Sequence, residues 1–258
     1  MALTLVSLGS SFAAGPLIPP VADADAGRSG RNYPALVAAG LGAELVDLTV
    51  SGATTATILD EPQTTFTGKV YPPQIDGVPR EADVVTVTAG GNDLEYTASM
   101  LFAAFRRLDP DHPASQVLAP RFPHGLRDVP DELVRTAESG LVRIVERAAD
   151  RTEGARVVLV DYLTVIGGGT SGDAWFDDAE RELLRRTMTA LEGAYERAAA
   201  RTGAELVRAS ELSRDHGLGS AEPWVTGLLA DPLLSAASFH PNALGMQRVA
   251  AEVLRLLA

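Results

Sequence analysis

The chain has 258 residues, of which 46% are hydrophobic and 22% charged, so it carries enough apolar side chains to bury a core and is not disordered. Its formal net charge of -12 and the lack of any basic run exclude a nucleic-acid partner, because phosphate binding depends on clustered Lys and Arg. Without cysteine, the chain has no disulfide, no thiolate nucleophile and no thiolate metal site.

Five short runs rich in Val, Leu and Thr alternate with helix-like stretches along the chain. In chain order, the runs predict buried parallel strands over 3–8, 43–48, 83–89, 156–162 and 204–207. Amphipathic patterns predict helices over 33–41, 96–107, 130–151, 177–201 and 243–257. This alternation is typical of a doubly wound α/β sheet, in which ligands bind outside the carboxyl ends of the strands.

The chain shows no internal repeat and no linker rich in Ser and Pro, so we expect one domain covering residues 1–258. Its longest irregular stretch, 108–129, has the length of a lid or a binding loop. No basic residue precedes the apolar N-terminus, and no apolar stretch reaches the about 20 residues that span a bilayer. We therefore expect a cytoplasmic protein without stable membrane insertion, or a secreted one if a leader has been removed.

A serine follows the first predicted strand directly, in Gly9-Ser10-Ser11. A hydroxyl at a strand-to-helix turn is exposed at the top of the sheet, where backbone N–H groups can face a developing negative charge. The same residues are also common in ordinary turns. A phosphate cradle is disfavoured, because no Lys-Ser/Thr pair follows the glycines.

Three further motifs follow later elements. Ser51-Gly52 comes after the second strand, Gly90-Gly91-Asn92-Asp93 after the third, and His240-Pro241-Asn242 lies just before the last helix. Asn92 offers a side-chain donor at the top of the sheet, and His240 is a candidate general base. Each motif alone is more often an ordinary turn or helix cap than part of an active site.

Taken together, the order Gly-x-Ser, Gly, Gly-x-Asn-Asp and His-Pro-Asn resembles the SGNH hydrolase family, also called GDSL esterases and lipases. The resemblance spans nearly the whole chain and implies a flavodoxin-like three-layer α/β/α sandwich with a five-stranded parallel sheet. It implies Ser11 as nucleophile and His240 as base, with an oxyanion hole formed by the N–H groups of Ser11 and Gly52 and the side chain of Asn92. It implies no cofactor.

The chain departs from the family pattern at two positions. Ser10 stands where the family usually has Asp, so the contacts of that carboxylate to neighbouring loops are expected to be absent or weaker. Ala237 stands three residues before the base, where the family motif has the acid of the catalytic triad. We predict that a backbone carbonyl near Ala237 accepts the Nδ1–H bond of the histidine. The catalytic residues would then be a Ser-His dyad without a side-chain acid. A branch of the family that the chain resembles suggests the same arrangement.

Two other segments bear on ligands. Trp224 and Val225 lie in an apolar stretch before His240 and predict a wall for the substrate, although packing beneath a loop explains them equally well. Four residues of the Pro-rich loop could suggest a metal site: Asp109, Asp111, His112 and His124. Because the chain has no pair of histidines at helical spacing, we interpret these residues as part of the surface and predict no metal.

The sequence thus predicts a serine esterase or lipase that hydrolyses small-molecule carboxylic esters of short to medium acyl chains through an acyl-enzyme. A sugar O-acetyl esterase, a phospholipase or a thioesterase with the same residues is the alternative. A non-catalytic binding module that has lost its triad acid is another.

Overall fold

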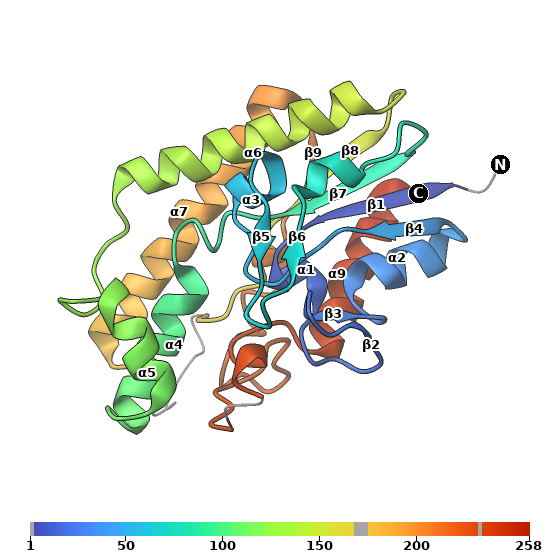
Figure 1. Cartoon of the computed structure of the whole chain (residues 1–258). Helices are drawn as coiled ribbons and strands as arrows, with labels where there is room; N and C mark the ends of the chain where they lie inside the picture. The colour runs from blue at the N-terminus through green and yellow to red at the C-terminus, as the bar shows by residue number, and fades with distance from the viewer. Residues whose placement is uncertain (1–2, 168–174, 232–233) are drawn as a thin grey trace.

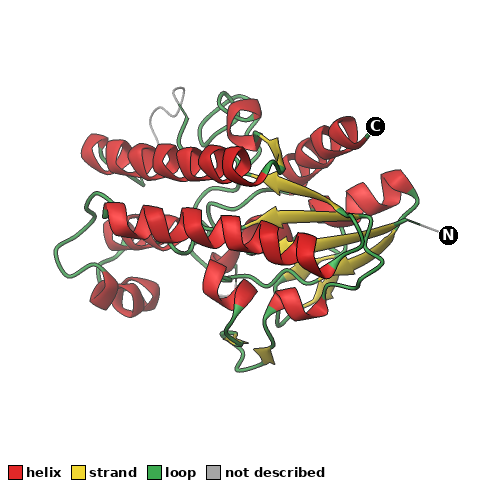
Figure 2. Cartoon of the chain, turned by 90° about the horizontal axis from the view of Figure 1, so that it is seen from above, coloured by secondary structure: helices red, strands yellow, loops and turns green. Residues whose placement is uncertain are grey.

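The computed structural model describes residues 3–167, 175–231 and 234–258. A five-stranded parallel sheet runs through the molecule with helices on both sides (Figures 1 and 2). Helices α2 and α9 pack together on one face of the sheet, and α6 and α7 pack together on the other. The chain therefore has the three-layer α/β/α architecture that the resemblance implied.

The sheet has the strand order β4-β1-β7-β8-β9. Its strands are β1 (Thr4–Gly9), β4 (Glu44–Asp47), β7 (Val84–Thr88), β8 (Arg156–Val160) and β9 (Glu205–Val207). Because β1 pairs with β4 on one side and β7 on the other, the loop after β1 lies between the loops after those two strands. Ligands of open α/β sheets bind at such a switch point, outside the carboxyl ends of the strands.

Nine α-helices lie within the described residues: α1 (Ser11–Ala14), α2 (Tyr33–Leu41), α3 (Thr55–Leu59), α4 (Tyr96–Leu108), α5 (Pro113–Leu118), α6 (Asp131–Arg151), α7 (Asp178–Thr202), α8 (Ala209–Leu212) and α9 (Ala243–Leu257). Local signals define their ends. The Asn32 side chain caps α2 by accepting from the N–H of Ala35, and Asp177 and Glu180 form a capping box at the start of α7. Gly203, at φ 73°, ends α7 in the left-handed conformation.

The predicted long strands and helices are confirmed within one or two residues, but the stretch 108–129 is not irregular throughout. It contains α5, whose first residue is Pro113 and whose N-terminus is capped by the His112 side chain accepting from the N–H of Ala114. Proline at the first helical position is compatible with a helix, because the missing N–H has no partner there in any case. His112 also stacks on Phe105 at 4.3 Å, which explains its position in this loop.

Two short antiparallel hairpins, also unpredicted, flank the loop after β4. They are β2 (Val21–Asp23) with β3 (Arg28–Ser29), and β5 (Gln63–Thr64) with β6 (Val70–Tyr71). The Tyr71 hydroxyl donates to the Asp23 carboxylate at 2.8 Å, and this hydrogen bond joins the two hairpins. They lie side by side near α1 and the carboxyl end of the sheet (Figure 1).

Candidate active site

The nucleophile candidate sits at the turn from β1 into α1. Gly9 has φ 152°, and a Cβ there would lie 2.5 Å from the carbonyl oxygen of Thr88. The Ser10 N–H donates to that same oxygen at 2.9 Å. This close approach of β1 to β7 needs a glycine, and it ends the strand so that α1 begins at Ser11.

Ser11 and His240 are brought together from opposite ends of the chain. The Ser11 Oγ and His240 Nε2 atoms are 2.7 Å apart, a hydrogen-bond distance between residues 229 positions apart in sequence. The side chains are nearly buried, at 6% and 5% exposure. The geometry is that of a serine whose hydroxyl proton can pass to an imidazole.

The other ring nitrogen of His240 faces a backbone carbonyl. Nδ1 lies 2.8 Å from the carbonyl oxygen of Ser238. The prediction placed the acceptor near Ala237, and the carbonyl of Ala237 itself accepts the backbone N–H of His240 at 3.3 Å. The acceptor is therefore one residue nearer to the histidine. Because a carbonyl only accepts, Nδ1 carries the proton and Nε2 is free to accept from Ser11.

The backbone at Phe239 makes this contact possible. Phe239 has φ 62°, in the left-handed region that bulky residues rarely adopt, and its side chain is fully buried. Such strain costs about 1–3 kcal/mol and persists only where the surroundings enforce it. Here the Phe239 N–H donates to the Thr226 carbonyl at 2.9 Å, and the Thr226 N–H donates to the His240 carbonyl at 2.8 Å. Nothing in the sequence signals this conformation.

Trp224 and Val225, predicted as a substrate wall, are instead buried at 4% and 2% exposure. Trp224 stacks on His216 at 3.9 Å, and its carbonyl accepts the N–H of Asn242 at 2.9 Å. Val225 forms an isolated antiparallel bridge with Pro241. We therefore revise the expectation: this segment holds the histidine loop in place, and its apolar character is explained by packing.

Burial governs the protonation of His240. Desolvation lowers the pKa of His240 from 6.5 to about 4, partly opposed by the hydrogen bond with the Ser238 carbonyl. The imidazole is thus neutral at pH 7, as a general base requires. Phe12 contributes to this apolar environment, with its ring centroid 5.3 Å from that of His240.

The predicted oxyanion donors come from the two loops beside Ser11. Asn92 donates through Nδ2 to the Ala53 carbonyl at 2.8 Å, so one amide hydrogen ties the loop after β7 to the loop after β4. The second hydrogen of that NH₂ group is left for another acceptor. Among the residues that the structure describes, neither the Ser11 N–H nor the Gly52 N–H has a hydrogen-bond partner.

Asp93 reinforces the same connection. Its carboxylate accepts from the N–H of Thr55 at 3.1 Å and from the Thr55 hydroxyl at 2.5 Å, at the start of α3. Burial raises the pKa of Asp93, and the two donors of Thr55 partly offset that rise. The loops that carry Gly52 and Asn92 are therefore held together at two points.

Ser10 makes a contact that the sequence did not predict. Its hydroxyl lies 2.8 Å from the hydroxyl of Tyr162, which also accepts the N–H of Gly91 at 3.1 Å. A Cβ at Gly91 would lie 2.6 Å from the Tyr162 ring, so the glycine makes room for the tyrosine. Tyr162 thus connects the nucleophile turn to the Asn92 loop, where the family pattern has an Asp at position 10.

Gln74 supports the nucleophile turn from the other side. It is 4% exposed, and its side-chain amide accepts from the Gly9 N–H at 2.8 Å and donates to the Gly9 carbonyl at 3.0 Å. Neither Gln74 nor Tyr162 belongs to a motif around the candidate residues, so only the three-dimensional structure reveals them.

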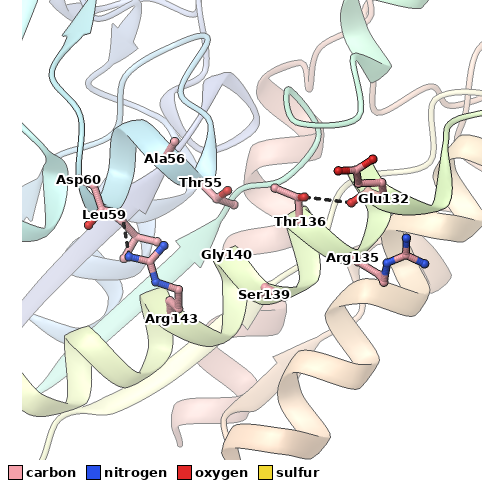
Figure 3. A pocket seen from close by; sticks show the side chains of 10 residues that line it. All are labelled: Thr55, Ala56, Leu59, Asp60, Glu132, Arg135, Thr136, Ser139, Gly140 and Arg143. Carbon is pink, nitrogen blue, oxygen red and sulfur yellow. Dashed lines mark hydrogen bonds and ion pairs between the residues drawn. The ribbon is translucent and has the colours of Figure 1, made fainter.

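A surface groove with a cavity volume of about 350 Å³ lies between α3 and α6 (Figure 3). Its lining residues include neither Ser11 nor His240, and Asp60 and Arg143 in its wall are already paired at 2.7 Å. We assign no role to it.

Within the described part of the chain, no group of three or more acidic or histidine side chains could hold a metal ion. None of the helices in these described residues combines the length and the apolar composition that a membrane span requires.

Comparison with known proteins shows the family and the fold. The model of the GDSL-like lipase/acylhydrolase family matches residues 7–248. Lipase 2 of Streptomyces coelicolor is 30% identical over 266 residues, covering 99% of this chain and 86% of that protein.

Two solved structures have the same fold. The extracellular lipase of Streptomyces rimosus superposes with a TM-score of 0.72 at 22% identity, covering 99% of this chain and 98% of the other. Phospholipase A1 of Streptomyces albidoflavus superposes with a TM-score of 0.77 at 20% identity, covering both chains completely.

Proposed function

The chain belongs to the GDSL-like lipase/acylhydrolase family, and from that premise we propose that it hydrolyses carboxylic esters of short to medium acyl chains with Ser11 as nucleophile and His240 as base. Family membership makes it a carboxylic ester hydrolase. The observation that carries the assignment of residues is the 2.7 Å contact between Ser11 Oγ and His240 Nε2. We further propose that residues 1–258 act as one domain.

The proposed reaction follows from this contact. His240 Nε2 takes the hydroxyl proton as Ser11 Oγ attacks the ester carbonyl carbon, and the carbonyl oxygen becomes an oxyanion. The N–H groups of Ser11 and Gly52 and the side chain of Asn92 donate hydrogen bonds to it. When the intermediate collapses, the leaving alcohol takes the proton from His240. Water then attacks the acyl-enzyme by the same route and frees Ser11.

Hydrolysis of p-nitrophenyl esters of increasing acyl length, measured across pH, tests the proposal. We expect turnover to be highest for short to medium acyl chains. Only neutral His240 can accept a proton, and burial lowers its pKa to about 4. The acid limb of kcat/KM should therefore lie well below the usual histidine pKa of about 6.5. Absence of turnover on every ester, or an acid limb at the usual histidine pKa, contradicts the proposal.

A further inference from the structure

We infer that Gln63 is a positioning residue for the oxyanion hole, because it fixes the direction in which the Gly52 N–H points. The inference rests on the proposed role of that N–H in ester hydrolysis. It assigns a function to the β5–β6 hairpin, which no sequence motif singles out.

Gly52 lies in a tight turn after β4. The Ala53 N–H donates to the Val50 carbonyl at 3.0 Å, which closes a four-residue turn with Gly52 at its third position. Gly52 has φ 84°, as the third residue of a type II turn requires. In the alternative, a type I turn, the first and last residues keep their positions, but the central peptide is rotated by roughly 180°. In this turn the central peptide joins Ser51 to Gly52.

The orientation of that peptide decides where the oxyanion donor points. In a trans peptide the carbonyl and the N–H point in opposite directions, so fixing the Ser51 carbonyl also fixes the Gly52 N–H. Gln63 Nε2 donates to the Ser51 carbonyl oxygen at 2.8 Å. Rotation of the peptide into the type I form breaks this hydrogen bond and turns the N–H of Gly52 away from its present direction.

Gln63 is itself held in place. Its side chain is 8% exposed, and the Thr57 hydroxyl lies 3.5 Å from its Oε1. Because the Ser51 carbonyl can only accept, the Gln63 amide must face it with its NH₂ group. Its backbone lies in the β5–β6 ladder, in register with Tyr71.

No other side chain in the described part of the chain bonds the Ser51 carbonyl. The hydroxyl of Ser51 is buried without a hydrogen-bond partner there, so it does not fix the peptide. The Ser51 N–H donates to the Ala26 carbonyl at 2.8 Å, but this bond holds the preceding peptide. Gln63 is therefore the side chain that distinguishes the two orientations of the Ser51-Gly52 peptide.

The decisive variant is Gln63→Leu, which keeps much of the side-chain volume and removes the donor. Deleting one oxyanion donor lowers kcat by about 10²–10³-fold. Releasing a donor without deleting it should cost less, so we expect kcat to fall by about tenfold to a hundredfold. KM should change little, because the oxyanion forms only after the substrate has bound. A trifluoromethyl ketone, which forms an oxyanion on Ser11, should lose affinity by the same factor as kcat/KM.

Thr64→Ala is the matched control. Thr64 is the next residue of β5, is exposed, and has no side-chain hydrogen bond within the described residues. This variant tests the general effect of a substitution in the hairpin and should retain wild-type kcat and ketone affinity.

Gln63→Glu tests the donor itself. The ionised carboxylate has no proton to give to the Ser51 carbonyl, whereas the protonated acid donates through its O–H. Activity relative to the wild type at the same pH should therefore rise as the pH falls from about 7 to about 5, toward the ordinary glutamic acid pKa of about 4.3. No such recovery is expected for Gln63→Leu.

The outcomes separate this inference from the proposed function. If the wild type hydrolyses esters and folded Gln63→Leu matches it in kcat and ketone affinity, Gln63 does not position the donor and only the inference fails. It fails as well if Gln63→Leu and Thr64→Ala lose activity equally, since the hairpin then matters only as a whole. If the wild type hydrolyses no ester and binds no ketone, the inference fails together with the proposed function.

Discussion

Replacing His240 by Ala should lower kcat by about 10⁵-fold or more, because loss of the base in a serine hydrolase removes nearly all of the chemistry that depends on the nucleophile. Ser11 then has no acceptor for its proton at 2.7 Å. The fold should remain, since the histidine loop is held by backbone hydrogen bonds of the 224–226 segment. Steady-state hydrolysis of a p-nitrophenyl ester, with circular dichroism to confirm folding, measures the effect.

The matched control is Asp161→Asn, which tests whether a hidden carboxylate completes a triad. Asp161 follows β8, is 5% exposed, and accepts from the N–H of Ser210 at 2.8 Å and its hydroxyl at 2.7 Å. Burial raises the pKa of Asp161 to about 7, opposed by the hydrogen bonds from Ser210. Asp161 has no hydrogen bond with His240, so kcat should stay within about tenfold of wild type. A loss as large as that of His240→Ala refutes the dyad.

A backbone carbonyl in place of the triad acid can fix the tautomer of His240, but it cannot stabilise the imidazolium as a carboxylate does. In the Ser-His-Asp arrangement, replacing the Asp by Asn costs about 10⁴-fold in kcat, chiefly because the imidazole takes the wrong tautomer. The Ser238 carbonyl can only accept, so it enforces the correct tautomer without a negative charge. What the dyad lacks is the attraction between a carboxylate and the imidazolium that forms during the reaction.

Asn92→Ala should lower kcat by about 10²–10³-fold with little change in KM, as expected when one donor to the oxyanion is lost. Asn92 also donates to the Ala53 carbonyl, so the variant removes one of the two ties between its loop and the Gly52 loop. The second tie, between Asp93 and Thr55, should keep the loops together. The measurement is kcat and KM on the preferred p-nitrophenyl ester, together with the melting temperature.

Asn92→Asp provides the control for shape. The carboxylate has nearly the same size as the amide but no hydrogen to donate, and its charge repels the oxyanion. Its kcat should fall at least as far as that of Asn92→Ala. Unchanged kcat in either folded variant means that Asn92 does not stabilise the oxyanion.

Much of the fold could be predicted from the sequence because its signals are local. β1, β7 and β8 are nearly continuous apolar runs, as strands buried on both faces must be. Parallel strands bring their carboxyl ends to one edge of a sheet, so the position of each motif directly after a predicted strand placed Ser11, Gly52 and Asn92 at that edge. Their grouping into one site was implied by the family resemblance.

The supporting residues could not be predicted, because their contacts join segments far apart in sequence. Tyr162 contacts Ser10 across 152 positions, and Gln74 contacts Gly9 across 65. The sequence shows that Ser10 departs from the family pattern, but it does not show that Tyr162 forms a hydrogen bond with Ser10. The acceptor for His240 could be predicted only as a carbonyl near Ala237, because the choice of Ser238 depends on the left-handed backbone at Phe239, which has no sequence signal.

Reaction with a fluorophosphonate, followed by mass spectrometry of the labelled peptides, tests most directly whether Ser11 is a nucleophile activated by His240. We expect rapid addition of one phosphonyl group, located on Ser11, with no addition in Ser11→Ala and much slower addition in His240→Ala. A folded wild-type protein that stays unlabelled, or is labelled on a residue other than Ser11, contradicts the assignment of Ser11 as the activated nucleophile. Such a result would favour a binding module over an enzyme with an activated serine.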